Sequence, residues 1–229
     1  MGGGGGPSSD SFFTAHGISV NEIRPNNPAK EIIVGDNESS IRAMGGRVIN
    51  YAHTVFHGRF SKTTSLTTMT EVAGLRTLME RTYDRSDILF QWNLHISSSY
   101  YQIAGYIFFA KSSSAGSLEP NDSPTFTTLT GAQGTAAGTR GVSAFNTINY
   151  VRGSSDTTYS LFNESGSYLA DAATLGTNSN SRFILATIGI RGYNDSHPVH
   201  INRNNHDGDQ WYHTVPISTF TMFEIANND

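Results

Sequence analysis

The sequence predicts an all-β protein, a sandwich or jelly roll preceded by an extended N-terminal arm. Ser, Thr, Asn and Gly are abundant in its 229 residues, whereas typical helix formers are sparse. Short runs of β-branched and aromatic residues are separated by turn-like clusters, giving roughly eight to ten strands. No segment has the 3.6-residue periodicity of an amphipathic helix. Together these observations favour a single β domain of about 180 residues plus an arm.

Composition limits the partners and the chemistry. Charged residues make up 15% of the chain and the formal net charge is -4, so we expect neither a nucleic-acid partner nor a polybasic membrane contact. The chain has no cysteine, which excludes disulfides and thiolate chemistry. No apolar run reaches the roughly 18 residues of a membrane-spanning helix, and no signal peptide is recognisable. We therefore expect the protein to be made in a cytoplasm and not to insert into a membrane.

Residues 1–46 differ in character from the rest and are predicted to form the arm. The glycine-rich leader has no Lys-Ser/Thr pair after it, so it is not a phosphate-binding loop. Pro25 and Pro28 favour an extended, helix-free path. The apolar residues of the arm are too scattered to build a core, and they suit docking on another protein. They are Phe12, Phe13, Ile18, Val20, Ile23, Ile32, Ile33 and Val34. The alternative is that the arm packs on its own domain.

The β domain is predicted to span residues 47–229, beginning after Gly45-Gly46. Residues 48–56 are expected to form the first strand, and residues 61–70 a polar edge or loop. Strands are then predicted over 72–79 and 87–97. In the latter, one face is apolar at every second position, which is the clearest period-two pattern in the chain. Its core-facing residues are Ile88, Phe90, Trp92, Leu94 and Ile96.

The second half is expected to alternate strands with long loops. Residues 100–111 are predicted to form an aromatic strand, and residues 119–141 a loop rich in Pro, Gly, Thr and Ala. Residues 142–151 and 157–163 are interpreted as a strand pair, and residues 166–180 as a loop of small residues. Strands are predicted over 183–189 and 199–202.

The closing strand, Ile217–Ile225, is predicted to be apolar on both faces. Ile217, Phe223 and Ile225 point to one side, and Phe220 and Met222 point to the other. Both faces therefore need cover. We expect one face to close the sandwich and the other to lie at a subunit interface.

Several segments, taken in order, resemble a bacteriophage virion β-domain, the C1q/TNF-like jelly roll of tail fibres, head fibres and capsid decoration proteins. The resemblance is carried by residues 47–51 (RVINY), 71–75 (EVAGL), 86–90 (SDILF), 155–159 (SDTTY) and 218–225 (STFTMFEI). It covers about four fifths of the chain and excludes the arm. It implies a homotrimer without enzymatic activity, made in the host cytoplasm and located in the virion.

Two functions follow from this resemblance. In the first, the chain is a capsid decoration, or cement, protein whose trimer binds the major capsid protein and stabilises the head lattice. In the second, it is a short tail or head fibre that joins tail or portal proteins and binds the host surface with its jelly-roll tip. A cellular C1q-like or TNF-like ligand is a weaker third reading, because signal peptide, cysteines and collagen-like repeat are missing.

Residues that could support other chemistry were considered in turn. Histidines and aspartates cluster in residues 195–213, but their spacing fits neither a zinc helix nor a calcium loop, so we expect no metal and no other cofactor. No Gly-x-Ser-x-Gly motif exists, and the carboxylates are scattered over loops, so no catalytic residue is assigned. His53 and His57 are interpreted as hydrogen-bonded structural residues. Aromatic residues could stack on a host-surface glycan, with packing as the alternative; they are Tyr100, Tyr101, Tyr168, Tyr193, Trp211 and Tyr212.

Overall fold

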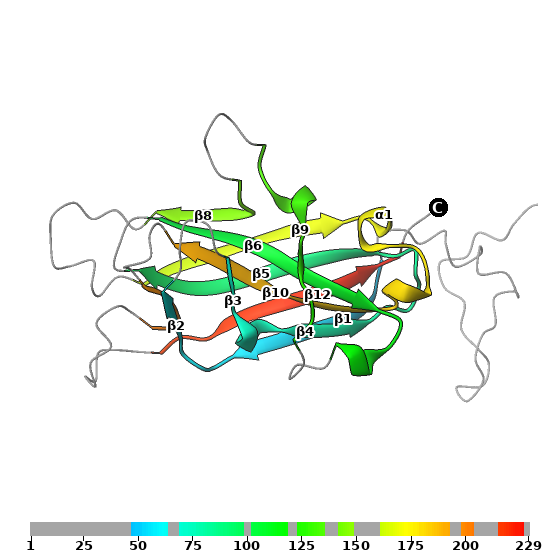
Figure 1. Ribbon diagram of the computed structural model, residues 1–229, viewed down its shortest axis with the longest axis horizontal. Helices are drawn as coiled ribbons and strands as arrows, with labels where there is room; N and C mark the ends of the chain where they lie inside the picture. The colour runs from blue at the N-terminus through cyan, green and yellow to red at the C-terminus, as the bar shows by residue number, and fades with distance from the viewer. Residues whose placement is uncertain are drawn as a thin grey trace, which may run out of the picture. The chain divides into compact units, whose positions relative to one another are not determined.

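The computed structural model describes residues 47–63, 69–98, 102–118, 123–135, 142–148, 161–192, 198–203 and 215–226. The predicted arm, residues 1–46, lies outside this range. In the described part, antiparallel strands form two sheets that pack face to face, with one short α-helix (Figure 1). The prediction of an all-β sandwich is confirmed.

The first sheet is built around the long strand β5 (Asp87–Ser98). On one side, β5 pairs with β9 (Phe162–Ala170). On the other side, it pairs with β12 (Ser218–Ile225) and then with β11 (Pro198–Ile201). Beyond them, β1 (Val48–Phe56) pairs with β12, and β2 (Phe60–Thr63) pairs with β11. The closing strand is thus an interior strand of the sheet.

The second sheet has β10 (Phe183–Gly192) and β6 (Gln102–Ser112) at its centre. The short strands β3 (Thr70–Glu71) and β4 (Thr77–Glu80) both pair with β10. The short strands β7 (Thr127–Thr128) and β8 (Phe145–Ile148) both pair with β6. Turns of 3-10 helix occupy Ala73–Leu75, Ala115–Ser117, Thr130–Ala132 and Ser179–Ser181, and α1 spans Ala172–Leu175.

The core lies between the two sheets and explains the period-two pattern of β5. The five apolar residues predicted to face inward on this strand are all buried, and they pack with residues of β6, β10 and β12. Between the sheets, Trp92 and Phe145 form a tilted pair with ring centroids 5.7 Å apart. A Cβ atom at Gly166 would overlap the indole of Trp92, and one at Gly105 would overlap the ring of Phe145. These two glycines are therefore required by the aromatic pair rather than by backbone conformation.

Strands β11 and β12 are two parts of one strand. Ile201 lies opposite Ile96, and the backbone N–H of Asn202 donates to the carbonyl of His95. The register of β12 with β5 then begins at Thr219, opposite Asn93, and the hydroxyl of the preceding residue, Ser218, accepts the N–H of His95. Asn202 has a φ of 60° and its side chain bonds Ser218. The chain thus leaves the strand after Asn202 and re-enters it at Ser218, at the neighbouring ladder position.

Asn202 also holds a matching break in the adjacent strand. Its Nδ2 donates to the carbonyls of Phe56 at 2.7 Å and Gly58 at 3.0 Å, where β1 ends before β2 begins. Thus one side chain satisfies two carbonyls at the junction between β1 and β2.

The strand predictions hold best where alternation is strong. The first strand has the predicted bounds, and β5, β6, β10 and β11 lie within a few residues of theirs. The predicted strand over 72–79 is wrong in part, because the 3-10 turn at Ala73–Leu75 interrupts it. The loop predicted over 119–141 contains β7 and a 3-10 turn.

The prediction for residues 142–180 is the main error. We expected a strand pair followed by a loop from residue 166, but β8 and β9 belong to different sheets and β9 continues to Ala170. The sequence gives no strand signal here because none of Ser165, Gly166 and Ser167 is a good strand former. The glycine is present for the indole of Trp92, and the two serines lie on the face directed away from the core.

Candidate functional site

The outer face of the first sheet carries a row of apolar side chains that crosses four strands. Paired positions place Tyr51, Phe223, Leu89 and Leu169 side by side on β1, β12, β5 and β9; we call these four residues the apolar row. The next row, Ala52, Met222, Phe90 and Tyr168, packs in the core. Since neighbouring rows face opposite sides of a sheet, the apolar row faces away from the core.

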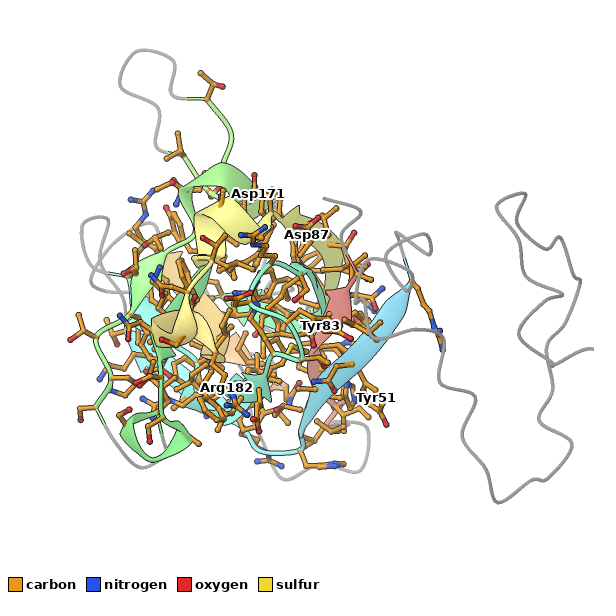
Figure 2. The ribbon with its side chains drawn as sticks, turned by 90° about the vertical axis from the view of Figure 1, so that its right-hand side faces the viewer. Tyr51, Tyr83, Asp87, Asp171 and Arg182 are labelled. Atoms are coloured by element: carbon orange, nitrogen blue, oxygen red, sulfur yellow. The ribbon has the colours of Figure 1, made fainter. Side chains whose placement is uncertain are left out.

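The apolar row is incompletely covered by the described residues of its own chain. Tyr51 is 68% exposed and Leu169 is 51% exposed at its two ends, and Phe223 and Leu89 are half-buried between them. Tyr51 is seen on β1 at the outer side of the domain in Figure 2. Val48, which is exposed, and Ile225 lie opposite each other at the end of the same face. Exposed large apolar side chains gathered on one sheet face are typical of an interaction surface.

The outer face of the second sheet is partly covered by its own chain. Leu185 and Ala110 are buried there against Leu118, with Phe126 packed on the same cluster. Phe126 also stacks on Phe108, with ring centroids 6.2 Å apart. Leu118 and Phe126, which follow β6 in the chain, therefore cover part of this face. The two sheets thus differ, because only the first leaves a continuous apolar row exposed in the described chain.

Beside the apolar row runs a second row of polar side chains, which contains no Asp, Glu, Lys or Arg; we call it the polar row. His53, Thr221, Gln91 and Ser167 occupy its four positions on β1, β12, β5 and β9. His53 Nδ1 and Thr221 Oγ1 are 2.7 Å apart and form a hydrogen bond. The following row contains Val55, Thr219, Asn93 and Ser165. A hydrogen-bonding surface of this kind can be covered by a partner without burying a carboxylate, ammonium or guanidinium group.

A buried polar network holds the end of this sheet. Glu224, fully buried at the end of β12, accepts the N–H groups of Thr82 and Tyr83 at 2.8 and 2.9 Å and the hydroxyl of Ser86. Arg81 donates to the carbonyl oxygens of Ser86, Gly176 and Ser181. Burial lowers the pKa of Arg81, and the nearby charge of Glu224 opposes this. The loop between β4 and β5 is therefore fastened to the closing strand.

Two carboxylates at the same end accept hydrogen bonds from backbone N–H groups of the helix α1. The Asp171 side chain accepts the N–H of Thr174 at 2.7 Å as the N-cap, and this bonding lowers the pKa of Asp171. The Asp87 side chain accepts the N–H of Ala172 at 2.9 Å. Figure 2 views this end of the sandwich and labels both residues. Their proximity is explained by helix capping and requires no acid–base role.

The residues predicted for the closing strand divide as expected between two faces, with one exception. Phe220 and Met222 are fully buried in the core, and Phe223 and Ile225 are half-buried on the outer side. Ile217 lies before the start of β12 and is 47% exposed, so the prediction that it belongs to the buried strand is wrong. The physical reason is that the chain re-enters the sheet only at Ser218. The eight apolar residues predicted for attachment all lie in the arm, outside the described residues.

Other residues considered from the sequence are placed as follows. His53 is hydrogen-bonded as predicted, whereas His57 lies after the end of β1 and is exposed. His200 is buried in β11, and most of the His/Asp-rich segment lies outside the described residues. Tyr168 packs against the core, so it does not offer an open ring for a glycan. The other aromatic residues proposed for that role lie outside the described residues.

Sequence reasoning missed three members of the apolar row: Tyr51, Leu89 and Leu169. Leu89 did carry a signal, because it is the apolar exception on a β5 face that otherwise reads Gln91, Asn93 and His95. Leu169 had none, since its strand was not recognised.

In the part of the chain that the structure describes, no group of three or more His, Cys, Asp or Glu residues could hold a metal ion. None of the described helices has the length and apolar character needed to cross a membrane. Comparison with protein-family models and with curated proteins found no match to this chain.

Proposed function

We propose that the chain is a non-enzymatic bacteriophage virion protein, a capsid decoration protein whose homotrimer binds and stabilises the head lattice. The virion assignment rests on the sequence resemblance. The observation that supports assembly is the difference between the two sheets, one partly covered by its own chain and the other exposing the apolar row. The proposed occupants of this surface are the other copies of the homotrimer, packed around its threefold axis.

The order of strand pairing supports a jelly roll. If the split strands are counted as one, the first sheet reads β1/β2, β12/β11, β5, β9, and the second reads β3/β4, β10, β6, β7/β8. Successive strands after β1 then alternate between the sheets, except where β6 is followed by β7/β8. Eight strands connected across two antiparallel sheets in this way are typical of the jelly roll.

The pairing of Arg47 with Ala226 supports a role for the arm in attachment. Ala226 donates its backbone N–H to the carbonyl of Arg47 at 2.9 Å, so the arm joins the domain beside the end of β12. In a trimer, three arms would leave from the same end of the particle. Three weak contacts to a lattice then act together, giving strong attachment without any single tight contact.

A short tail or head fibre is the second candidate. Strands β2, β5, β8 and β10 all end on the side opposite Arg47, which follows from the register of β5 with β12, β11 and β9 and of β6 with β8 and β10. In the fibre hypothesis, a host-surface glycan or receptor is bound on that side of the domain.

The oligomeric state tests the assembly part of the proposal. Light scattering coupled to size-exclusion chromatography at pH 8.0 should give the mass of three chains. Leu169→Asp should give a folded monomer, because the charge would enter the apolar row. Thr127→Asp is the matched control, since Thr127 is exposed on β7 of the second sheet. A monomeric parent chain, or an equal effect of both variants, would contradict this interface.

Placement in the virion is tested separately. In cryo-electron microscopy of virions, density at threefold or quasi-threefold positions of the head would exclude the fibre, and density only at the tail would exclude the decoration protein. Deletion of residues 1–46 should leave the trimer intact but prevent its binding to empty heads. If the shortened trimer still binds, the arm is not the anchor.

A further inference from the structure

We infer that His53 makes the association between copies of this chain pH-dependent, so that the copies assemble when its imidazole is neutral and separate when it is protonated. The inference rests on the proposed assembly through the outer face of the first sheet. Its basis is the position of His53 in the polar row, directly beside the apolar row on β1.

The geometry fixes the orientation of the ring. His53 Nδ1 is held at 2.7 Å from Thr221 Oγ1, and Thr221 is 9% exposed. The ring is therefore anchored by Nδ1 at its base, while the side chain as a whole remains exposed. Among the described residues, nothing bonds to the other ring nitrogen, Nε2. A partner covering the apolar row would also cover this nitrogen.

No described carboxylate beside His53 could balance the charge of a protonated ring. Its outer-face neighbours are Tyr51 and Val55 on β1, with Thr219, Thr221 and Phe223 on β12 and then Gln91 on β5. Glu224 lies on the core side of β12, where it accepts backbone N–H groups from the loop between β4 and β5. Arg76 is packed against the opposite side of β1, beside Thr54, and pairs with Glu71.

The other titratable groups on this face are more distant. Asp87 lies in the row of Ile225 at the end of the sheet, His95 lies on β5 beyond Asn93, and exposed His57 lies past the end of β1. Neither a carboxylate nor a second cation of the described residues therefore adjoins His53 in the polar row. Covering the ring costs little when it is neutral, whereas an imidazolium would lose its hydration without gaining a partner.

Histidine is the side chain whose charge changes between about pH 5 and 8. Association of the neutral form is therefore favoured at the upper end of this range and opposed at the lower end. Each copy contributes one histidine, so once the imidazole of the separate chain is protonated, the association constant should fall up to about tenfold per histidine for each further pH unit.

The test measures mass by light scattering at pH 8.0 and pH 5.5, at one protein concentration, for three full-length chains. The parent chain should be assembled at pH 8.0 and monomeric at pH 5.5. His53→Asn, which places an amide where Nδ1 bonds Thr221 but cannot become a cation, should be assembled at both. His57→Asn, the matched control outside the polar row, should behave as the parent does. Circular dichroism at both pH values confirms folding.

The outcomes separate the two proposals. A parent chain that stays assembled at pH 5.5, a His53→Asn variant that dissociates as the parent does, or a loss of pH dependence in His57→Asn would overturn the role of His53. A parent chain that is monomeric at pH 8.0 would instead overturn the proposed assembly, and this inference with it.

Discussion

The two faces of β12 should respond differently to the same substitution. Phe220 is fully buried and stacks on Phe90, with ring centroids 6.1 Å apart. Phe220→Ser removes this contact, leaves a cavity and buries a hydroxyl, which together should cost about 4 kcal/mol or more. Phe223 lies on the outer face between Tyr51 and Leu89. In the single domain, Phe223→Ser should cost at most about 1 kcal/mol, the value of a cross-strand contact.

Two assays distinguish these losses. In urea unfolding with a slope of about 2 kcal/mol/M, Phe220→Ser should lower the midpoint by about 2 M, and Phe223→Ser by about 0.5 M. In light scattering at pH 8.0 the order should reverse. An aromatic residue at the centre of an interface contributes about 2 kcal/mol, so Phe223→Ser should weaken association about 30-fold per contact. Unfolding is measured at concentrations low enough to dissociate every chain, because assembly itself adds stability.

Equal outcomes would refute the reasoning. If both variants lose the same free energy of unfolding, both faces of β12 are core, and the copies must associate elsewhere. If Phe223→Ser assembles as the parent chain does, the apolar row is not the interface. A Met222→Leu variant serves as a control for the core, since this swap conserves volume and should cost under about 1.5 kcal/mol.

Three further predictions concern stability. Glu224→Gln should lower the free energy of unfolding in urea by about 3 kcal/mol, because the buried donors lose a charged acceptor. The control Glu80→Gln, at an exposed ion pair, should lower it by less than about 1 kcal/mol. Equal losses would contradict the buried network. Gly166→Ala should lower the free energy of unfolding by about 1–3 kcal/mol through its overlap with Trp92, and a neutral result in thermal unfolding would show that the indole can move. Burial raises the pKa of Tyr106, so the unfolded chain ionises first and stability should fall as pH rises above about 10. Tyr106→Phe should remove that loss and cost nothing at pH 7, since among the described residues the buried hydroxyl has no hydrogen-bond partner; a destabilised variant would reveal one.

The fold was predictable from sequence where one strand carries its own signal. Alternation along β5 identifies its core face without reference to any other strand, and the same holds for Phe220 and Met222 on β12. Strand β9 was not predicted because its Gly166 is required by close contact with Trp92, a residue distant in sequence. The apolar row was hidden for a related reason, since each of its four strands contributes a single residue. Only the pairing register brings these residues together, and register is a property of the folded sheet.

The split between β11 and β12 bears on how this protein could change over time. Asn202 and Ser218 already hold the positions that adjacent residues of an uninterrupted strand would hold, and their side chains close the gap. The length and sequence of residues 203–217 can therefore change, or a foreign peptide can replace them, while both flanking segments remain paired with β5. Variation between Asn202 and Ser218 would then leave the pairing of the first sheet unchanged.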